Sequence, residues 1–261
     1  LVIGRGKQAD SVWNKINGDK DVPYVLEILN AAKYEQIITC VNEEATKAGI
    51  VSAFQTLTES CQPNDIVYIH YSGHGQQMRD IGNDEVDILD ECWIPYDAYM
   101  TYCEQDKGEK HLSDDEIAKL LSGIKTKIGE EGEILVVVDA CHSGGSTRGD
   151  DELYDGLCIR GAEKYFEIPE RAEVPSTDIS EQWLTLSACK DYEDNFECVS
   201  PAVGKLTYVL YELRRSLHSM SNDELLNEIS RMMNSSKLKG PKRQNPTLSE
   251  YKGEIKRFFQ R

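Results

Sequence analysis

Short apolar runs alternate with segments of helical periodicity along most of the chain. Five runs have the length and the β-branched composition of strands, at residues 1–4, 35–41, 65–72, 133–141 and 183–190. Five segments repeat apolar residues at helical spacing, at residues 22–33, 43–61, 113–128, 204–217 and 221–233. Because strands that alternate with helices form βαβ units, we expect an α/β fold whose mostly parallel central sheet has helices on both faces.

Two polar segments interrupt this alternation. Residues 79–91 read as an acidic loop, and residues 142–182 form a long, weakly patterned stretch. A loop of that length inside a compact domain is usually functional or mobile. The chain has no internal repeat and no low-complexity tract. We therefore expect one domain over residues 1–261, with residues 142–182 as an internal linker.

A histidine and a cysteine follow the ends of two predicted strands. His74 lies between Gly73 and Gly75, whose missing side chains allow unusual backbone angles and leave room for a ligand. Cys141 leaves the next strand for a glycine-rich turn, and parallel sheets bind ligands at such strand ends. An imidazole and a thiolate there predict a Cys/His dyad with backbone N–H groups as an oxyanion hole. Each residue alone is equally typical of a solvent-exposed turn histidine or a buried structural cysteine.

The charge balance narrows the classes of partner. A net charge of −17 over 261 residues argues against binding nucleic acid, and it suits basic peptides or hard metal ions. A soluble acidic surface accounts for much of the excess equally well. With 39% hydrophobic and 29% charged residues the composition is that of a soluble globular protein, and no apolar run approaches the roughly 20 residues of a membrane span.

The cysteines and the first residue bear on the compartment. Eight cysteines show no CxxC pair and no regular spacing, which favours a reducing, cytoplasmic location over a zinc site or a disulfide framework. The chain begins at Leu1, already within an apolar run, so we expect its natural start to have been trimmed. A secreted origin therefore stays open.

The motifs HYSGHG (70–75) and DACHSG (139–144) resemble those of metacaspase-type cysteine peptidases in the caspase-like superfamily, most closely the bacterial branch. GNDEVDILDECWIPYDA and LSDDEIAKLL lie between these motifs and LTLSAC lies after them, which is the family's order. The resemblance implies a caspase-like fold and a monomeric endopeptidase. It makes His74 the general base and acid, Cys141 the nucleophile, and the N–H groups of Gly75 and Cys141 the oxyanion hole.

The same resemblance implies an acidic pocket for the substrate residue before the cleaved bond. The matching positions are Asp21, Ser72 and Asp139, and Asp139 shares a strand face with Cys141. Two carboxylates suit a guanidinium or an ammonium group, so we expect protein or peptide substrates cut after Arg or Lys. Asp21 is also typical of a helix start, and Gly18 stands where the family often has a cysteine.

Calcium regulation and self-processing are further implications of the resemblance. A regulatory Ca²⁺ site would use Asp87, Asp114 and Asp115, although residues 113–116 (SDDE) also form the pattern of a helix capping box. Four basic residues of the linker are candidates for self-cleavage, and an uncut surface loop is the alternative. The sequence does not choose among these four, which are Arg148, Arg160, Lys164 and Arg171.

Two other readings of the chain remain. One is a catalytically silent member of the family that serves as a scaffold or binding module. The other is a dinucleotide-binding oxidoreductase, because residues 3–9 (IGRGKQA) fit a loosened glycine fingerprint. Residues 10–19 lack helical periodicity, so we expect residues 3–9 to mark a loop that leaves the first strand. His70 lies within a strand pattern and is expected to be a hydrogen-bonded core residue, not a zinc ligand.

Overall fold

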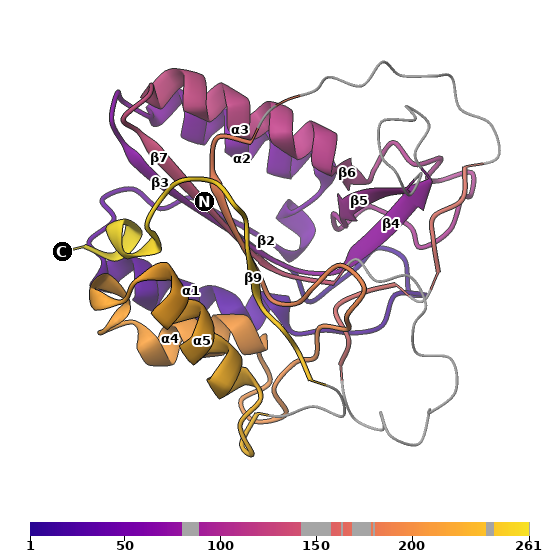
Figure 1. Ribbon diagram of the computed structural model, residues 1–261. Coiled ribbons are helices and arrows are strands. Elements are labelled where there is room, and N and C mark those ends of the chain that lie inside the picture. Colours follow the sequence, from indigo (N-terminus) through magenta and orange to yellow (C-terminus); the bar gives the residue numbers. More distant parts are fainter. Residues whose placement is uncertain are drawn as a thin grey trace.

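The computed structural model describes residues 1–79, 89–141, 158–162, 164–168, 179, 181–238 and 243–260. Its main sheet has six strands in the order β2-β1-β3-β7-β8-β9, and every neighbouring pair is parallel except β8 and β9 (Figure 1). The strands are β1 (Val2–Gly4), β2 (Thr39–Val41), β3 (Ile66–Ser72), β7 (Glu133–Asp139), β8 (Leu184–Ser187) and β9 (Thr247–Leu248). The predicted α/β class with a mostly parallel sheet is confirmed.

Among the described residues, five α-helices cover the two faces of this sheet (Figure 1). Helices α2 (Lys47–Ser60) and α3 (Asp114–Ile128) pack on one face, and α1 (Gly18–Ala31), α4 (Lys205–Leu213) and α5 (Asn222–Met233) pack on the other. Short 3-10 turns add η1 (Asn42–Glu44), η3 (Leu217–Ser219) and η4 (Ile255–Phe259). The prediction of helices on both faces is therefore confirmed.

Side-chain caps explain where three helices begin. Thr46 accepts a hydrogen bond from the backbone N–H of Gly49 ahead of α2. Ser113 and Ser221 each form a complete capping box with the glutamate three residues later. The capping-box alternative for residues 113–116 is thus confirmed, and it fixes the first turn of α3.

Strand β7 is buried on both faces, as its continuous apolar run predicts. Ile134, Val136 and Val138 pack toward α2 and α3, while Leu135 and Val137 pack toward α1 and α4. Full burial of such side chains contributes about 1.5–3 kcal/mol each. The carboxyl end of β7, where Asp139 lies, is therefore held by the core of the domain.

A second, three-stranded antiparallel sheet was not predicted. It consists of β4 (Gly75–Arg79), β5 (Leu89–Trp93) and β6 (Leu112–Ser113). The expected acidic loop at residues 79–91 is wrong at both ends, because Arg79 and residues 89–91 belong to paired strands. The polar run of β4 has no apolar alternation of its own, so only its pairing with β5 makes it a strand.

Part of the predicted linker lies along this second sheet. Gly161 and Phe166 form parallel bridges with Gly75 and Met78 of β4. Phe166 is fully buried, and its backbone N–H donates to the carbonyl of Gln77 at 2.9 Å. The expectation of a weakly structured segment is therefore wrong for residues 158–162 and 164–168, which pack against the domain.

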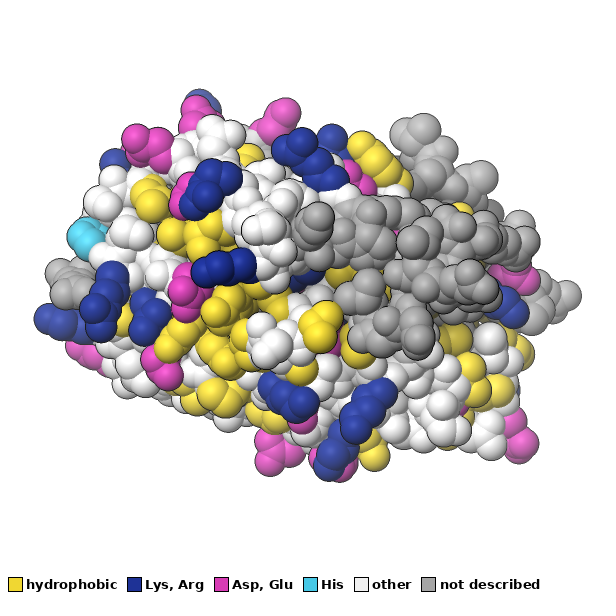
Figure 2. All heavy atoms as spheres, turned by 90° about the horizontal axis from the view of Figure 1, so that it is seen from below, with side chains coloured by type: hydrophobic (Ala, Val, Ile, Leu, Met, Phe, Trp, Pro, Cys, Tyr) yellow, Lys and Arg dark blue, Asp and Glu magenta, His cyan; other side chains and the backbone are white. Residues whose placement is uncertain are grey.

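The structure also bears on the expected acidic surface, on membrane-spanning helices and on the first loop. On the side of α4 and α5, basic and acidic side chains lie interspersed around apolar ones (Figure 2), so the acidic excess is not uniform. Among the described residues no helix is long and apolar enough to cross a bilayer. Residues 5–17 contain no helix, as expected for a loop that leaves the first strand, but α1 already begins at Gly18, within the stretch that lacked helical periodicity.

Candidate active site

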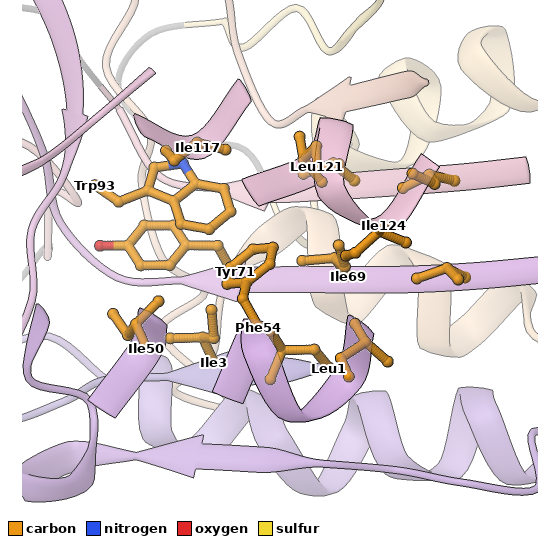
Figure 3. Close-up of a cluster of buried hydrophobic side chains, with 14 of the residues drawn as sticks. Leu1, Ile3, Ile50, Phe54, Ile69, Tyr71, Trp93, Ile117, Leu121 and Ile124 are labelled. Carbon is orange, nitrogen blue, oxygen red and sulfur yellow. The ribbon is translucent and has the colours of Figure 1, made fainter. Parts of the chain in front are cut away.

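The turn that carries His74 is fixed by the core beneath it. Tyr71 stacks on Trp93 with ring centroids 4.4 Å apart, inside the cluster drawn in Figure 3. Its hydroxyl donates to the His74 carbonyl at 2.6 Å. A Cβ on Gly73 would lie 2.6 Å from that hydroxyl. The expected unusual backbone angle at Gly73 is wrong, because its φ lies outside the left-handed region, and the glycine is needed for space.

The imidazole of His74 is buried and held in one tautomer. Nε2 lies 2.8 Å from the carbonyl oxygen of Asn14, which can only accept, so Nε2 carries the proton. Nδ1 therefore bears the lone pair, and it has no hydrogen-bond partner among the described residues. Trp13 stacks on the ring at 4.7 Å. Burial, together with the charge of Arg5, lowers the pKa of His74 to about 3, so the ring is a neutral base.

Cys141 lies two residues past the end of β7 and is buried. Its Sγ donates to the carbonyl of Glu193 at 2.9 Å. Cys189, just past the end of the neighbouring strand β8, donates to the same carbonyl at 3.4 Å. A hydrogen bond with Cys141, together with burial, raises the pKa of Cys189 well above its ordinary value. Cys189 therefore stays a thiol beside the candidate nucleophile, a neighbour that sequence reasoning missed.

The two N–H groups expected to form an oxyanion hole converge on one carbonyl. Gly75 N and Cys141 N donate to the carbonyl oxygen of Arg160, at 3.2 and 2.9 Å. A Cβ placed on Gly161 would lie 3.1 Å from Cys141 Sγ, so the thiol is adjacent to the Arg160–Gly161 peptide bond. The histidine turn and the cysteine thus meet at one amide carbonyl, which belongs to the chain itself.

Residues 158–162 lie in the site as a segment with isolated backbone bridges on both sides. Arg160 N donates to Asn195 O at 3.0 Å, and Glu197 N donates to Cys158 O at 3.0 Å. On the other side of the Arg160–Gly161 bond, Ala162 N donates to Gly75 O at 3.1 Å. The backbone is therefore bonded on both sides of that bond, as in peptide recognition by strand addition.

The side chain of Arg160 fills a buried acidic pocket. Nη1 donates to Asp21 Oδ2 at 2.7 Å and lies 3.4 Å from Asp139 Oδ1. Ser72 donates its hydroxyl to the same Asp21 oxygen at 2.7 Å. All four residues are at most 1% exposed. The pocket residues expected from the sequence therefore lie together around a guanidinium group.

The two aspartates of the pocket differ electrostatically. Burial would raise the pKa of Asp139, but attraction to Arg160 and hydrogen bonds from Asn195 and Thr207 lower it. Burial raises the pKa of Asp21, an effect that Arg160 only partly offsets. Asp139 is therefore the firmly ionised member of the pair.

A family model described as "Metacaspase, peptidase C14 domain" matches residues 20–148. Metacaspase-1 of Eremothecium gossypii is 36% identical over 99 residues, which are 38% of this chain and 20% of that protein. Metacaspase-1A of Neurospora crassa is 31% identical over 140 residues, or 49% of this chain and 27% of that protein. Residues 20–148 of this chain match a metacaspase-type domain.

Two solved structures share the fold of this chain. Protein GSU0716 of Geobacter sulfurreducens has a TM-score of 0.68 at 22% identity, over 100% of this chain and 96% of that one. Caspase-1 of Spodoptera frugiperda has a TM-score of 0.60 at 11% identity, over 95% and 84%. The caspase-like fold is therefore confirmed. The chain spans 20% of the length of one curated relative and 27% of another, and its bacterial branch stays a prediction.

Gly18 departs from the family pattern for a steric reason. A Cβ at this first residue of α1 would lie 2.5 Å from the carbonyl oxygen of Ser72 and 2.6 Å from that of Arg5. No side chain fits that approach without a shift of backbone. The close packing brings Asp21, one turn further along α1, against the Ser72 hydroxyl.

The expected calcium ligands are only partly within the described residues. Asp114 and Asp115 begin α3 and line a cavity of about 350 Å³ together with Glu91. Asp87 lies outside the described residues, and within them no three side chains form a metal-binding group. His70 is buried, and its ring nitrogens contact the hydroxyl groups of Tyr68, Ser72 and Thr207. Its interpretation as a hydrogen-bonded core residue is therefore confirmed.

The four candidates for self-cleavage differ in where they lie relative to the site. Arg160 lies in the site, whereas Lys164 is exposed four residues further on, past the Arg160–Gly161 bond. Arg148 and Arg171 lie outside the described residues. All eight cysteines are free thiols, and their spacing in the sequence likewise does not favour a disulfide framework.

Proposed function

We propose that this chain is a cysteine endopeptidase that cuts after basic residues and cleaves its own Arg160–Gly161 bond. One observation carries the proposal. The Arg160 carbonyl accepts hydrogen bonds from Gly75 N and Cys141 N while its guanidinium lies between Asp21 and Asp139. A substrate about to be cleaved needs its carbonyl at the oxyanion donors and its side chain in a matching pocket. Protein or peptide segments with an exposed basic residue would be the substrates in trans.

The chemistry follows from the atoms at this bond. The Cys141 proton turns from the Glu193 carbonyl to Nδ1 of His74, and Sγ attacks the carbonyl carbon of Arg160. The N–H groups of Gly75 and Cys141 stabilise the developing oxyanion. His74 then gives its proton to the Gly161 nitrogen as the C–N bond breaks.

A water molecule completes the cycle. It attacks the thioester between Cys141 and Arg160 while His74 takes one of its protons. The products are a carboxylate on Arg160, a new amino terminus at Gly161 and the regenerated thiol. Asn14 supports both steps, since its carbonyl keeps the Nε2 proton in place and leaves Nδ1 to exchange protons.

Incubation of the purified chain should produce fragments 1–160 and 161–261, measured by intact mass spectrometry. Arg160→Gln should remove this cut, because a neutral side chain does not match the buried carboxylates. Lys164→Gln is the matched control, since Lys164 is exposed, and it should leave the cut unchanged. A protein that cleaves basic peptides but keeps its Arg160–Gly161 bond would contradict self-processing. A cut after another linker residue would contradict the choice of bond.

We also propose that Ca²⁺ bound at Asp87, Asp114 and Asp115 stimulates the enzyme. Support comes from the cavity that Asp114, Asp115 and Glu91 line, because clustered carboxylate oxygens are the ligands that Ca²⁺ prefers. The described residues alone do not complete such a site, so no step of the reaction is assigned to the ion.

Removal of calcium with EGTA should lower the rate of peptide cleavage by about tenfold or more, as expected for a ligand that selects the active state. Added Ca²⁺ should restore the rate, and Mg²⁺ should not, because Mg²⁺ demands a tighter octahedral shell. Equal rates with EGTA and with Ca²⁺ would refute calcium stimulation and leave the peptidase proposal intact.

A further inference from the structure

We propose that Glu197 makes the pocket selective for arginine over lysine. The inference rests on the proposed function and assigns a specificity role to a residue outside the expected pocket. Glu197 is 2% exposed, and its Oε1 accepts a hydrogen bond from Nε of Arg160 at 3.0 Å. Nη2 of the same guanidinium lies 3.0 Å from this oxygen. Glu197 therefore faces the one edge of the guanidinium that includes Nε.

Contacts other than those with Arg160 hold the carboxylate of Glu197 in place. The backbone N–H of Asn17 donates to Oε1 at 2.7 Å, and the Asn17 side-chain amide donates to Oε2 at 2.5 Å. The backbone N–H of Glu197 also bonds the carbonyl of Cys158 at 3.0 Å. The same residue thus aligns the substrate backbone and presents a preorganised acceptor to the side chain.

The two aspartates of the pocket select for positive charge more than for the shape of the side chain. Asp139 uses its oxygens mainly on Asn195 and Thr207 and lies 3.4 Å from the guanidinium. Asp21 accepts from Nη1 at the far end of the side chain. An ammonium can approach these carboxylates too, because it is a compact charge with rotatable donors.

Lysine differs at the atom that faces Glu197. The fourth side-chain atom of arginine is Nε, which carries a proton, whereas the fourth atom of lysine is the methylene carbon Cε. A lysine in this pocket would place that methylene against Oε1 and leave a buried carboxylate oxygen with one donor fewer. Loss of a hydrogen bond to a charged group corresponds to about 10- to 100-fold in binding.

The test compares three capped peptides that copy residues 159–162, with arginine, lysine or an arginine analogue at the position of Arg160. In the analogue a methylene replaces Nε–H, so that length, planarity and charge are kept and only the donor to Glu197 is lost. The measured quantity is the ratio of kcat/KM values for the full chain. In some molecules Arg160 itself can still occupy the pocket. These molecules lower the three kcat/KM values by the same factor, which cancels in the ratio.

The wild-type chain should prefer arginine over both lysine and the analogue by about 10- to 100-fold. Glu197→Gln should narrow both preferences to within about threefold, since a neutral amide oxygen is a weaker acceptor than a carboxylate. Glu212→Gln, which removes an exposed charge of α4, should keep the wild-type ratios.

Equal cleavage of the arginine and analogue peptides by the wild-type chain would overturn the role of Glu197 and leave the peptidase proposal standing. A folded chain that cleaves none of the three peptides would overturn both. Should Glu197→Gln fail to fold, the comparison of arginine with its analogue in the wild-type chain decides alone.

Discussion

Replacing Cys141 by alanine should leave the Arg160–Gly161 bond intact and lower cleavage of arginine peptides by at least about 10³-fold. The thiol supplies the atom that forms the acyl intermediate, and the side chain of alanine cannot. The N–H of residue 141 remains in the variant, so binding of the carbonyl at the oxyanion donors is kept. Intact mass spectrometry over time and a peptide assay measure the two losses separately.

Cys103→Ala is the matched control for this variant, because Cys103 is a partly exposed thiol and is not among the residues placed in the site. It should keep both activities. A covalent thiol inhibitor with an arginine side chain should label the wild-type chain and the control but not Cys141→Ala. Unchanged cleavage by Cys141→Ala would contradict the assigned nucleophile. Absence of labelling and cleavage in all three proteins would favour the scaffold alternative.

The sequence predicts the strand ends that carry the candidate dyad because the information there is local. The runs that become β3 and β7 are apolar on both faces, and His74 and Cys141 follow them within two residues. Parallel pairing of these neighbours brings their carboxyl ends together. The position of Asp139 on the face of the pocket follows from the alternation of side chains along a strand.

The rest of the site depends on contacts between distant parts of the chain. Glu197 reaches Asn17 across 180 residues, and the Asn14 carbonyl reaches His74 across 60, so no spacing rule could find either. A backbone carbonyl also carries no identity in the sequence. Strand β4 was missed for a related reason, since its polar residues become a strand only through pairing with β5.

The choice of Arg160 among four basic residues has the same origin. Arg160 differs from the other three basic residues in its environment and not in its sequence neighbours, because three buried carboxylates surround its guanidinium group. Without a cation in the pocket, the folded state is destabilised, because the desolvation penalty of the buried carboxylates is then not offset. Before cleavage, Arg160 therefore serves as a structural counter-ion as well as a candidate substrate residue.

Arg160→Met should destabilise the uncleaved chain by about 3–5 kcal/mol at pH 7, the cost of removing one partner from a buried ion pair. Methionine keeps most of the volume and removes the charge. Both proteins should carry Cys141→Ala, so that self-cleavage does not complicate the comparison, and urea unfolding measures the difference. Lys164→Met in the same background is the control, and its exposed side chain predicts a change within about 0.5 kcal/mol.

The pH dependence of that difference has a definite sign. In the parent the pKa of Asp139 is lowered, so its stabilising contribution is present above the unfolded value of about 3.9 and is lost as the pH falls below it. Without Arg160, burial raises the pKa of Asp139, which costs stability above its unfolded value and is relieved as this carboxylate protonates. The gap between the two proteins should therefore shrink as the pH falls from 7 toward 4. A gap that widens, or a difference below about 1 kcal/mol at pH 7, would mean that Arg160 is not the counter-ion of a closed pocket.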